Sequence, residues 1–322
     1  MRRALCLFFG AAVLAGCAHK PVPAPMPQRL VLAVQSTQPE ATRAAWQPLA
    51  DDLGRQLGVP IEVRTASQTE TVRALADKRA DVVWLSSNAA IDAVVDADAR
   101  TFALYQNVNG TRGYKAVLLT RKDTGIRTLD EALAPGKWRY AAGAKTSTSG
   151  YVLPQYFLFA PRGSSPEQNF RGVIYGGHLP NMEALWSRQV DVAINNTTDM
   201  EQFQQRVPAS RGAFVTLWES PLVPNDVLMA RADMPQAVRQ RIADVVLHYG
   251  RTPQEKELLK RASGIEQFVP ADDKLLEPVA AFKFGTERAQ VEQDAKLSPA
   301  QKAQRLAQLD QRAQRFRQAL AK

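Results

Sequence analysis

The chain has 322 residues, 45% of them hydrophobic, which is long enough for one or two ordinary cores. Its two cysteines exclude a disulfide-rich scaffold. The net charge of +9 would suit nucleic acid, but the positive charges gather at the end of the chain, where six Lys and Arg residues oppose Asp310 alone from Ser298 onward. We interpret this segment as a solvated helix face that suits anionic lipid head groups, and we expect no nucleic-acid partner.

The N-terminus has the pattern of an export signal that ends at a cysteine. An Arg-Arg pair precedes an apolar run over 4–14, which is too short to cross a bilayer comfortably, and a Leu-Ala-Gly-Cys tetrapeptide follows at 14–17. This tetrapeptide resembles the lipobox of bacterial lipoproteins, which implies a signal peptide over 1–16 and diacylation of the Cys17 thiol. The alternative is an ordinary signal peptide followed by a chance cysteine.

Residues 17–28 are predicted to form an extended tether. Proline occurs at every second position from Pro21 to Pro27, which prevents helix and sheet and favours a stiff spacer. The other cysteine, Cys6, leaves with the signal peptide, so the mature chain is expected to have no disulfide. These features together predict a periplasmic lipoprotein that is anchored to a membrane.

From residue 30 to about 250 the chain alternates apolar strands with helical segments, which is typical of an α/β fold. A continuous apolar run over 30–34 predicts a strand that is covered on both faces. Helical spacing over 46–57 and 72–76 separates strands predicted at 61–63 and 81–85, which gives half of a doubly wound sheet. A second series follows, with strands predicted at 116–119, 138–142, 172–175 and 190–194 and helices at 129–133, 151–159 and 182–186.

Two successive series of this length predict two α/β lobes. Strands at 214–218 and 226–230 follow the second series, and the next helix begins near Pro235. The expected divisions are 29–114 for the first part of lobe 1, 115–217 for lobe 2, 218–270 for the return to lobe 1, and 271–322 for C-terminal helices.

The last helix carries an apolar stripe that recurs at three and four residues. The stripe predicts either a helix packed on its own lobe or a homodimer seam, and its barely two heptads leave both open. Its members are Leu306, Leu309, Ala313, Phe316 and Leu320.

A hydroxyl-rich segment over 143–151 lies between a predicted strand and a predicted helix. Ser147, Thr148 and Ser149 would gather with free backbone N–H groups at the helix N-terminus, where an oxyanion is favoured. The segment is not a P-loop, because no Gly-Lys-Ser/Thr closes it. Taken alone, it is also what an ordinary helix cap looks like.

His178 follows a Gly-Gly pair at the end of a predicted strand, where ligands bind in doubly wound sheets. A structural role for this histidine remains the alternative. A hydrolase could pair Ser149 with His178, but there is no Gly-x-Ser-x-Gly elbow, so we expect no enzyme. We expect no metal and no cofactor, since clustered soft ligands are absent from the sequence.

Five ordered motifs together resemble the phosphonate-binding periplasmic proteins of ABC importers, the phosphate, phosphite and phosphonate group. They are GYKAVLL at 113–119, STSGY at 147–151, GH at 177–178, VDVAINNT at 190–197 and SPLVPND at 220–226. The resemblance covers about residues 30–250. It implies a two-lobed periplasmic-binding fold of type II, which closes on its ligand about crossings near Tyr114 and Trp218 and passes it to a membrane permease.

The resemblance also implies a ligand site. The oxyanion would meet Ser147, Thr148, Ser149, Tyr114 and His178, and Asp226 matches a carboxylate that faces the amine in aminophosphonate binders.

Three positions depart from the family pattern. Gln68 replaces a tyrosine expected at the anion, Ser86-Ser87 replaces a Gly-Pro turn, and Thr198 stands at a second amine-facing carboxylate, with Asp199 adjacent. Binding of a phosphonate, phosphite or phosphate is therefore better supported than selectivity for an amine. A binding module that signals to a membrane partner is the competing interpretation.

Overall fold

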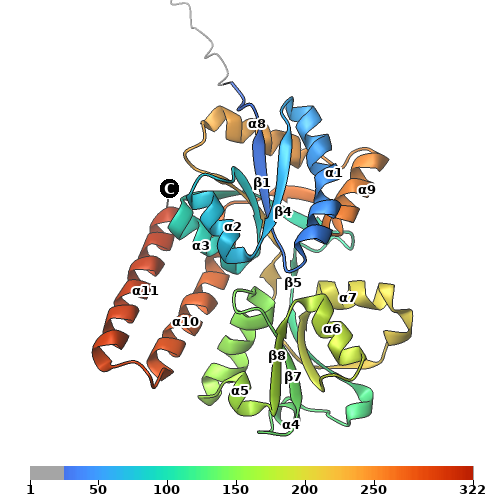
Figure 1. Ribbon diagram of the computed structural model, residues 1–322, viewed down its shortest axis with the longest axis vertical. Coiled ribbons are helices and arrows are strands. Elements are labelled where there is room, and N and C mark those ends of the chain that lie inside the picture. Colours follow the sequence, from blue (N-terminus) through green and yellow to red (C-terminus); the bar gives the residue numbers. More distant parts are fainter. Residues whose placement is uncertain (1–24, 322) are drawn as a thin grey trace, which may run out of the picture.

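The computed structural model describes residues 25–321, so the predicted signal peptide, Cys17 and most of the tether lie outside the described residues. The described chain forms two α/β lobes and a C-terminal helical hairpin (Figure 1). This arrangement confirms the predicted two-lobed α/β architecture. Within residues 25–321, no helix is long and apolar enough to cross a membrane.

Lobe 1 is a six-stranded sheet in the order β13-β4-β12-β3-β1-β2. β1 runs parallel to β2 and β3, whereas β12 and β13 pair antiparallel to their neighbours. Its strands are β1 Leu30–Gln35, β2 Ile61–Ala66, β3 Val82–Leu85, β4 Ala99–Asn107, β12 Val227–Arg231 and β13 Ile265–Pro270. Its helices are α1 Pro39–Leu57, α2 Gln68–Ala76, α3 Ser87–Ala97, α8 Gln236–Leu247 and α9 Pro253–Ser263.

Side chains that alternate along β3 fill both faces of this sheet. Val83 and Leu85 belong to the core under α2 and α3, whereas Val82 and Trp84 belong to the core under α1, α8 and α9. Trp84 also stacks on Tyr105 of β4, with ring centroids 5.0 Å apart. The sheet is therefore covered on both sides, which explains the continuous apolar runs of its strands.

Lobe 2 is a five-stranded sheet in the order β10-β6-β9-β7-β8, in which β7 runs parallel to β8 and β9. Its strands are β6 Ala116–Arg121, β7 Arg139–Gly143, β8 Gly172–Gly176, β9 Val192–Asn196 and β10 Phe214–Glu219. Its helices are α4 Leu129–Ala132, α5 Pro166–Asn169, α6 His178–Trp186 and α7 Thr197–Arg206, with π-type turns at Thr148–Val152 and Gln155–Phe159.

The chain passes between the lobes through two short strands that pair with each other, β5 Gly113–Tyr114 and β11 Val223–Pro224. A Cβ atom on Gly113 would lie 2.5 Å from the carbonyl oxygen of Val223, so only glycine permits this approach. The second crossing therefore falls beyond Trp218, which lies inside β10 and not at the hinge where we expected it.

The C-terminal hairpin consists of α10 Glu277–Gln293 and α11 Pro299–Leu320, and it lies beside α3 of lobe 1 (Figure 1). Phe316 is 2% exposed and joins the lobe 1 core, and its ring lies 6.4 Å from that of Phe284 on α10. Ala319 and Leu320 pack against the same core. The end of the apolar stripe thus packs on its own lobe, as one of the two alternatives predicted.

Several elements of lobe 1 are absent from the sequence-based prediction: β4, β13, α3 and α9. The residues of α3 show why, since they are buried on several sides and leave no clear apolar stripe. In lobe 2, the helix predicted over 151–159 is a pair of π-type turns, the first of which begins at Thr148.

Candidate functional site

A cavity of about 370 Å³ between the lobes collects the side chains that the sequence singles out. The walls come from the carboxyl ends of strands in both lobes, as expected for ligand sites in such sheets. The eight predicted residues all line it: Gln68, Tyr114, Ser147, Thr148, Ser149, His178, Thr198 and Asp226.

The hydroxyl-rich segment forms one end of this cavity. The Ser147 hydroxyl caps the π-type turn by accepting a hydrogen bond of 3.0 Å from the N–H of Gly150. A Cβ atom on Gly143 would lie 2.3 Å from the Cα of Gly150, so two glycines let the turn press against the end of β7. Thr148 and Ser149 are buried at the start of the turn, where backbone N–H groups have no partner inside the helix.

His178 is the first residue of α6, and its Nε2 atom lies 3.0 Å from the Ser149 hydroxyl. Burial lowers the pKa of the imidazole, although the nearby Asp199 opposes this shift. The ring is therefore neutral at physiological pH. The side-chain amide of Asn195 donates to the carbonyl oxygen of His178 at 2.8 Å and holds the start of the helix in place.

The Ser149–His178 pair lacks the third member of a hydrolytic triad. The Nδ1 atom of His178 is buried and has no hydrogen-bond partner among residues 25–321, whereas a triad requires a carboxylate there to orient the ring. The same part of the chain holds no cluster of three His, Cys, Asp or Glu residues suited to a metal ion. The geometry supports binding by neutral donors.

Tyr114 brings a further hydroxyl to this end of the cavity from the crossing strand β5. Burial raises the pKa of its phenol well above the usual value, although hydrogen bonds with Thr148 and Ser149 oppose the shift. The phenol therefore stays protonated and keeps a proton to donate. The hydroxyls of Tyr114, Thr148 and Ser149, which come from two segments distant in sequence, thus lie close together.

The cavity also has an acidic wall. Asp226 accepts a hydrogen bond of 3.0 Å from the side chain of Gln35, and Trp84 contributes another. Burial, together with the charge of Asp199, raises the pKa of the Asp226 carboxyl to about 7. Asp199 lines the cavity beside Thr198, so the chain supplies a second carboxylate one position after the one the sequence comparison indicated.

Sequence reasoning missed three residues of this wall: Gln35, Trp84 and Tyr105. Gln35 is the last residue of β1, and Trp84 is the penultimate residue of β3. Their positions at strand ends were the available signal, since such ends line ligand sites in α/β sheets. Tyr105 lies within β4, a strand that the sequence did not reveal.

Replacement of Asp226 by Asn should change how stability depends on pH. A carboxyl with a pKa near 7 in the folded state binds more protons than the unfolded chain between about pH 4 and 7, so folding stability falls as pH rises through this window. The amide that Asp226→Asn introduces does not titrate, so this contribution to the pH dependence of stability is lost. Denaturant unfolding without ligand should therefore find the variant more stable than the native protein, by a larger margin at pH 8 than at pH 5.

The exposed carboxyl of Asp130 provides a control for this experiment, since Asp130→Asn should leave the pH profile unchanged. Parallel profiles for native protein and Asp226→Asn from pH 5 to 8 would contradict the raised pKa.

Comparison with known proteins places the chain in a family. The sequence profile for "ABC transporter, phosphonate, periplasmic substrate-binding protein" matches residues 31–276. The phosphonates-binding periplasmic protein of Escherichia coli (strain K12) is 31% identical over 243 residues, which cover 74% of this chain and 71% of the relative.

Two solved structures share the fold. The binding protein component of an ABC phosphonate transporter from Pseudomonas aeruginosa superposes with a TM-score of 0.78 and 27% identity, covering 92% of this chain and 99% of that one. A protein from Prochlorococcus marinus (MIT 9301), solved in complex with methylphosphonate, has a TM-score of 0.68 and 18% identity, covering 79% of this chain and 97% of that one. The chain belongs to the family of periplasmic substrate-binding proteins of phosphonate ABC transporters.

Proposed function

We propose that this protein captures a phosphonate-type oxyanion between its two lobes and delivers it to an ABC permease in the inner membrane. One observation carries the proposal. Three hydroxyls of the 147–149 segment, the phenol of Tyr114 and the neutral ring of His178 line the interlobe cavity, and among residues 25–321 no Lys or Arg lines it. Neutral donors and N–H groups at a helix start suffice to hold an oxyanion.

The proton arrangement of these donors supports an oxyanion ligand. If the Nε2 atom of His178 carries the ring proton, it donates to Ser149, whose hydroxyl proton is then free for a ligand oxygen. The protonated phenol of Tyr114 supplies a second donor. Because these groups carry no charge, they recognise the oxyanion through directed hydrogen bonds in a buried site, where such bonds to charged groups are strong.

The acidic wall is suited to a positively charged substituent on the ligand. Asp226 and Asp199 both line the cavity, and an ammonium group between them would offset the burial and the repulsion that raise the pKa of Asp226. The protein from Prochlorococcus marinus holds methylphosphonate, which has no amine. We propose that this site takes a phosphonate in either case and that an amine adds affinity.

Lobe closure is the proposed mechanism. The lobes would rotate about β5 and β11, and ligand would stabilise the closed state through contacts that it makes only there. A permease would then recognise the closed form. A membrane sensor could recognise the same closed form. Neighbouring genes for a permease and an ATPase would indicate an importer, whereas a neighbouring gene for a membrane kinase would indicate a sensor.

Ligand binding should appear as a rise in melting temperature of the protein without its signal peptide. At a ligand concentration 100 times Kd, stabilisation is about 2.7 kcal/mol, which corresponds to several degrees. Methylphosphonate, 2-aminoethylphosphonate, phosphite and phosphate form the test panel, and calorimetry gives Kd for those that shift the transition. No shift with any of them at millimolar concentration contradicts the proposal.

Site variants locate the ligand in the same experiment. Ser149→Ala and His178→Ala should each weaken binding of the oxyanion, Ser149→Ala by about 10- to 100-fold, because a hydrogen bond to a charged group contributes about 1.5–3 kcal/mol. Ser210→Ala is the matched control, since this buried hydroxyl bonds to Val207 outside the cavity. Asp226→Asn should lower affinity for 2-aminoethylphosphonate more than for methylphosphonate.

Attachment of lipid at Cys17 remains a proposal, supported by the Leu-Ala-Gly-Cys tetrapeptide and the proline-rich tether. Protein extracted from membranes should have a mass that corresponds to a diacylated Cys17 at its N-terminus, and Cys17→Ser should be released from the membrane. Ligand binding should persist in Cys17→Ser. A native protein that fractionates as soluble, with no lipid in its mass, contradicts the anchor.

A homodimer through the C-terminal helices also stays a proposal. Its seam would have to include the part of the apolar stripe that is only partly buried, at Leu306, Leu309 and Ala313. Sedimentation velocity at micromolar and tenfold higher concentration should show a dimer that Leu306→Glu dissociates. A monomer at both concentrations contradicts the seam.

A further inference from the structure

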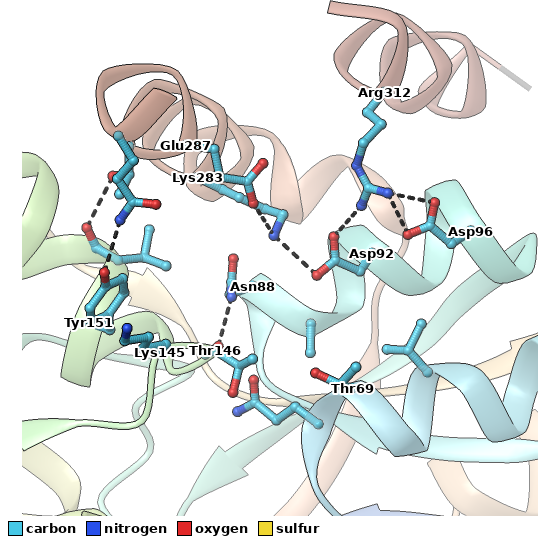
Figure 2. Close-up of a pocket in the computed structure, with 16 residues that line it drawn as sticks. Thr69, Asn88, Asp92, Asp96, Lys145, Thr146, Tyr151, Lys283, Glu287 and Arg312 are labelled. Carbon is cyan, nitrogen blue, oxygen red and sulfur yellow. Dashed lines mark hydrogen bonds and ion pairs between the residues drawn. The ribbon is translucent and has the colours of Figure 1, made fainter. Parts of the chain in front are cut away.

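Asn88 joins the two lobes directly beside the proposed oxyanion end of the cavity. It lies in the first turn of α3 in lobe 1 and is 3% exposed. Its backbone N–H donates to the Thr148 hydroxyl at 3.0 Å, and its side-chain Nδ2 donates to the carbonyl oxygen of Thr146 at 2.7 Å (Figure 2). One residue of lobe 1 therefore forms two hydrogen bonds with the segment that carries Ser147, Thr148 and Ser149.

The first of these bonds sets the direction of the Thr148 hydroxyl. A backbone N–H can only donate, so the Oγ1 atom of Thr148 must accept. A hydroxyl has one proton, which this bond does not use, so Thr148 can donate it to the nearby phenol oxygen of Tyr114 or to a ligand oxygen. Asn88 thus prepares Thr148 as a donor for an oxyanion, although Asn88 itself does not line the cavity that holds the proposed ligand.

The second bond sets the orientation of the Asn88 amide. The carbonyl of Thr146 can only accept, so the nitrogen of the amide must face it. The Oδ1 atom consequently points the other way, into a neighbouring cavity of about 410 Å³ beside α10, where it is buried without a hydrogen-bond partner within residues 25–321 (Figure 2). The amide therefore contributes to lobe contact through its nitrogen alone.

The C-terminal hairpin holds α3 in position for these bonds. Asp92, one turn after Asn88, forms ion pairs with Lys283 of α10 at 3.1 Å and with Arg312 of α11 at 2.6 Å (Figure 2). Arg312 also contacts Asp96 at 2.8 Å, and the Lys283 side chain is only 6% exposed. Removal of one partner from a buried pair is costly, so α3 presents Asn88 from a firmly held helix.

We propose that Asn88 is a closure latch, a positioning residue that forms its bonds to lobe 2 only when the lobes close and so slows ligand release. The inference rests on the proposed function, since it assigns a device to the same cleft. A contact made only in the closed state affects the dissociation rate constant and leaves the association rate constant nearly unchanged. A residue with a merely structural role would instead change folding stability.

Stopped-flow fluorescence of the protein without its signal peptide tests the latch, with methylphosphonate as the ligand and Trp84 in the cavity wall as the reporter. Asn88→Ala removes the bond to Thr146 and should raise the dissociation rate constant about fivefold, which corresponds to about 1 kcal/mol. Asn88→Asp has nearly the same shape but turns an acceptor toward the Thr146 carbonyl, so its release should be faster still. Association should stay within about twofold of native in both variants.

Asn169 provides the matched control. Its side-chain Nδ2 also donates to a carbonyl oxygen, that of Leu133 at 3.3 Å, but both residues belong to lobe 2 and lie outside the cavity. Asn169→Ala should lower the free energy of unfolding and leave ligand release unchanged. Dissociation rates within twofold of native for both Asn88 variants, or an increase that Asn169→Ala reproduces, overturn the latch.

Solution scattering separates this inference from the proposed function. The ligand-free protein exchanges between open and closed states, so Asn88→Asp should lower the closed population and increase the radius of gyration relative to native. If the native protein binds no phosphonate but Asn88→Asp increases the radius of gyration, the proposed function is wrong, whereas the contact of Asn88 with lobe 2 in the closed state is supported. If native protein binds phosphonate and neither release nor radius changes in the variant, the latch fails and the proposed function stands.

Discussion

The pairing of the two crossing strands determines how the two lobes face each other. β5 and β11 pair through Gly113, whose backbone approaches Val223 so closely that a side chain would collide. The lobes can therefore rotate about this pair but remain joined at it. Because parallel strands of both sheets end toward the cleft, the residues at their carboxyl ends face one another, and the candidate site exists only at that junction.

The electrostatics of the cavity follow from its burial. The cavity combines hydroxyls and a histidine that burial keeps neutral with Asp226, whose pKa burial raises to about 7. In water such groups would interact weakly, but exclusion of solvent by the two lobes strengthens each hydrogen bond to a charged ligand. The cavity thus combines neutral donors with carboxyls, and no Lys or Arg of the described residues lines it.

The C-terminal hairpin adds a third connection between the lobes. On the lobe 1 side, Lys283 of α10 pairs with Asp92, and on the lobe 2 side Gln290 donates to the Tyr151 hydroxyl at 3.0 Å. The Phe282 ring lies 5.2 Å from that of Phe157, which in turn lies 6.0 Å from Trp218. Movement of the lobes must therefore be accommodated along α10, so the hairpin takes part in the geometry of the cleft.

Local patterns in the sequence were enough to predict the alternation of strands and helices and the two lobes, because apolar periodicity is a local property. Polar clusters at strand ends are local too, and they pointed to Ser147, Thr148, Ser149 and His178 as candidates. The sequence did not reveal α3, most of whose residues are buried, or β4, whose sequence ARTFALYQN lacks a strict alternation of apolar and polar residues. It also placed the second crossing near Trp218, five residues before the strand that makes it. Three contacts became visible only in the folded chain. Asp226 accepts hydrogen bonds from Gln35 and Trp84. Asn88 donates to Thr146 and Thr148, and Phe316 of α11 packs on lobe 1. Each of these contacts joins residues far apart in the chain, and spacing along a single sequence carries no information about such distances.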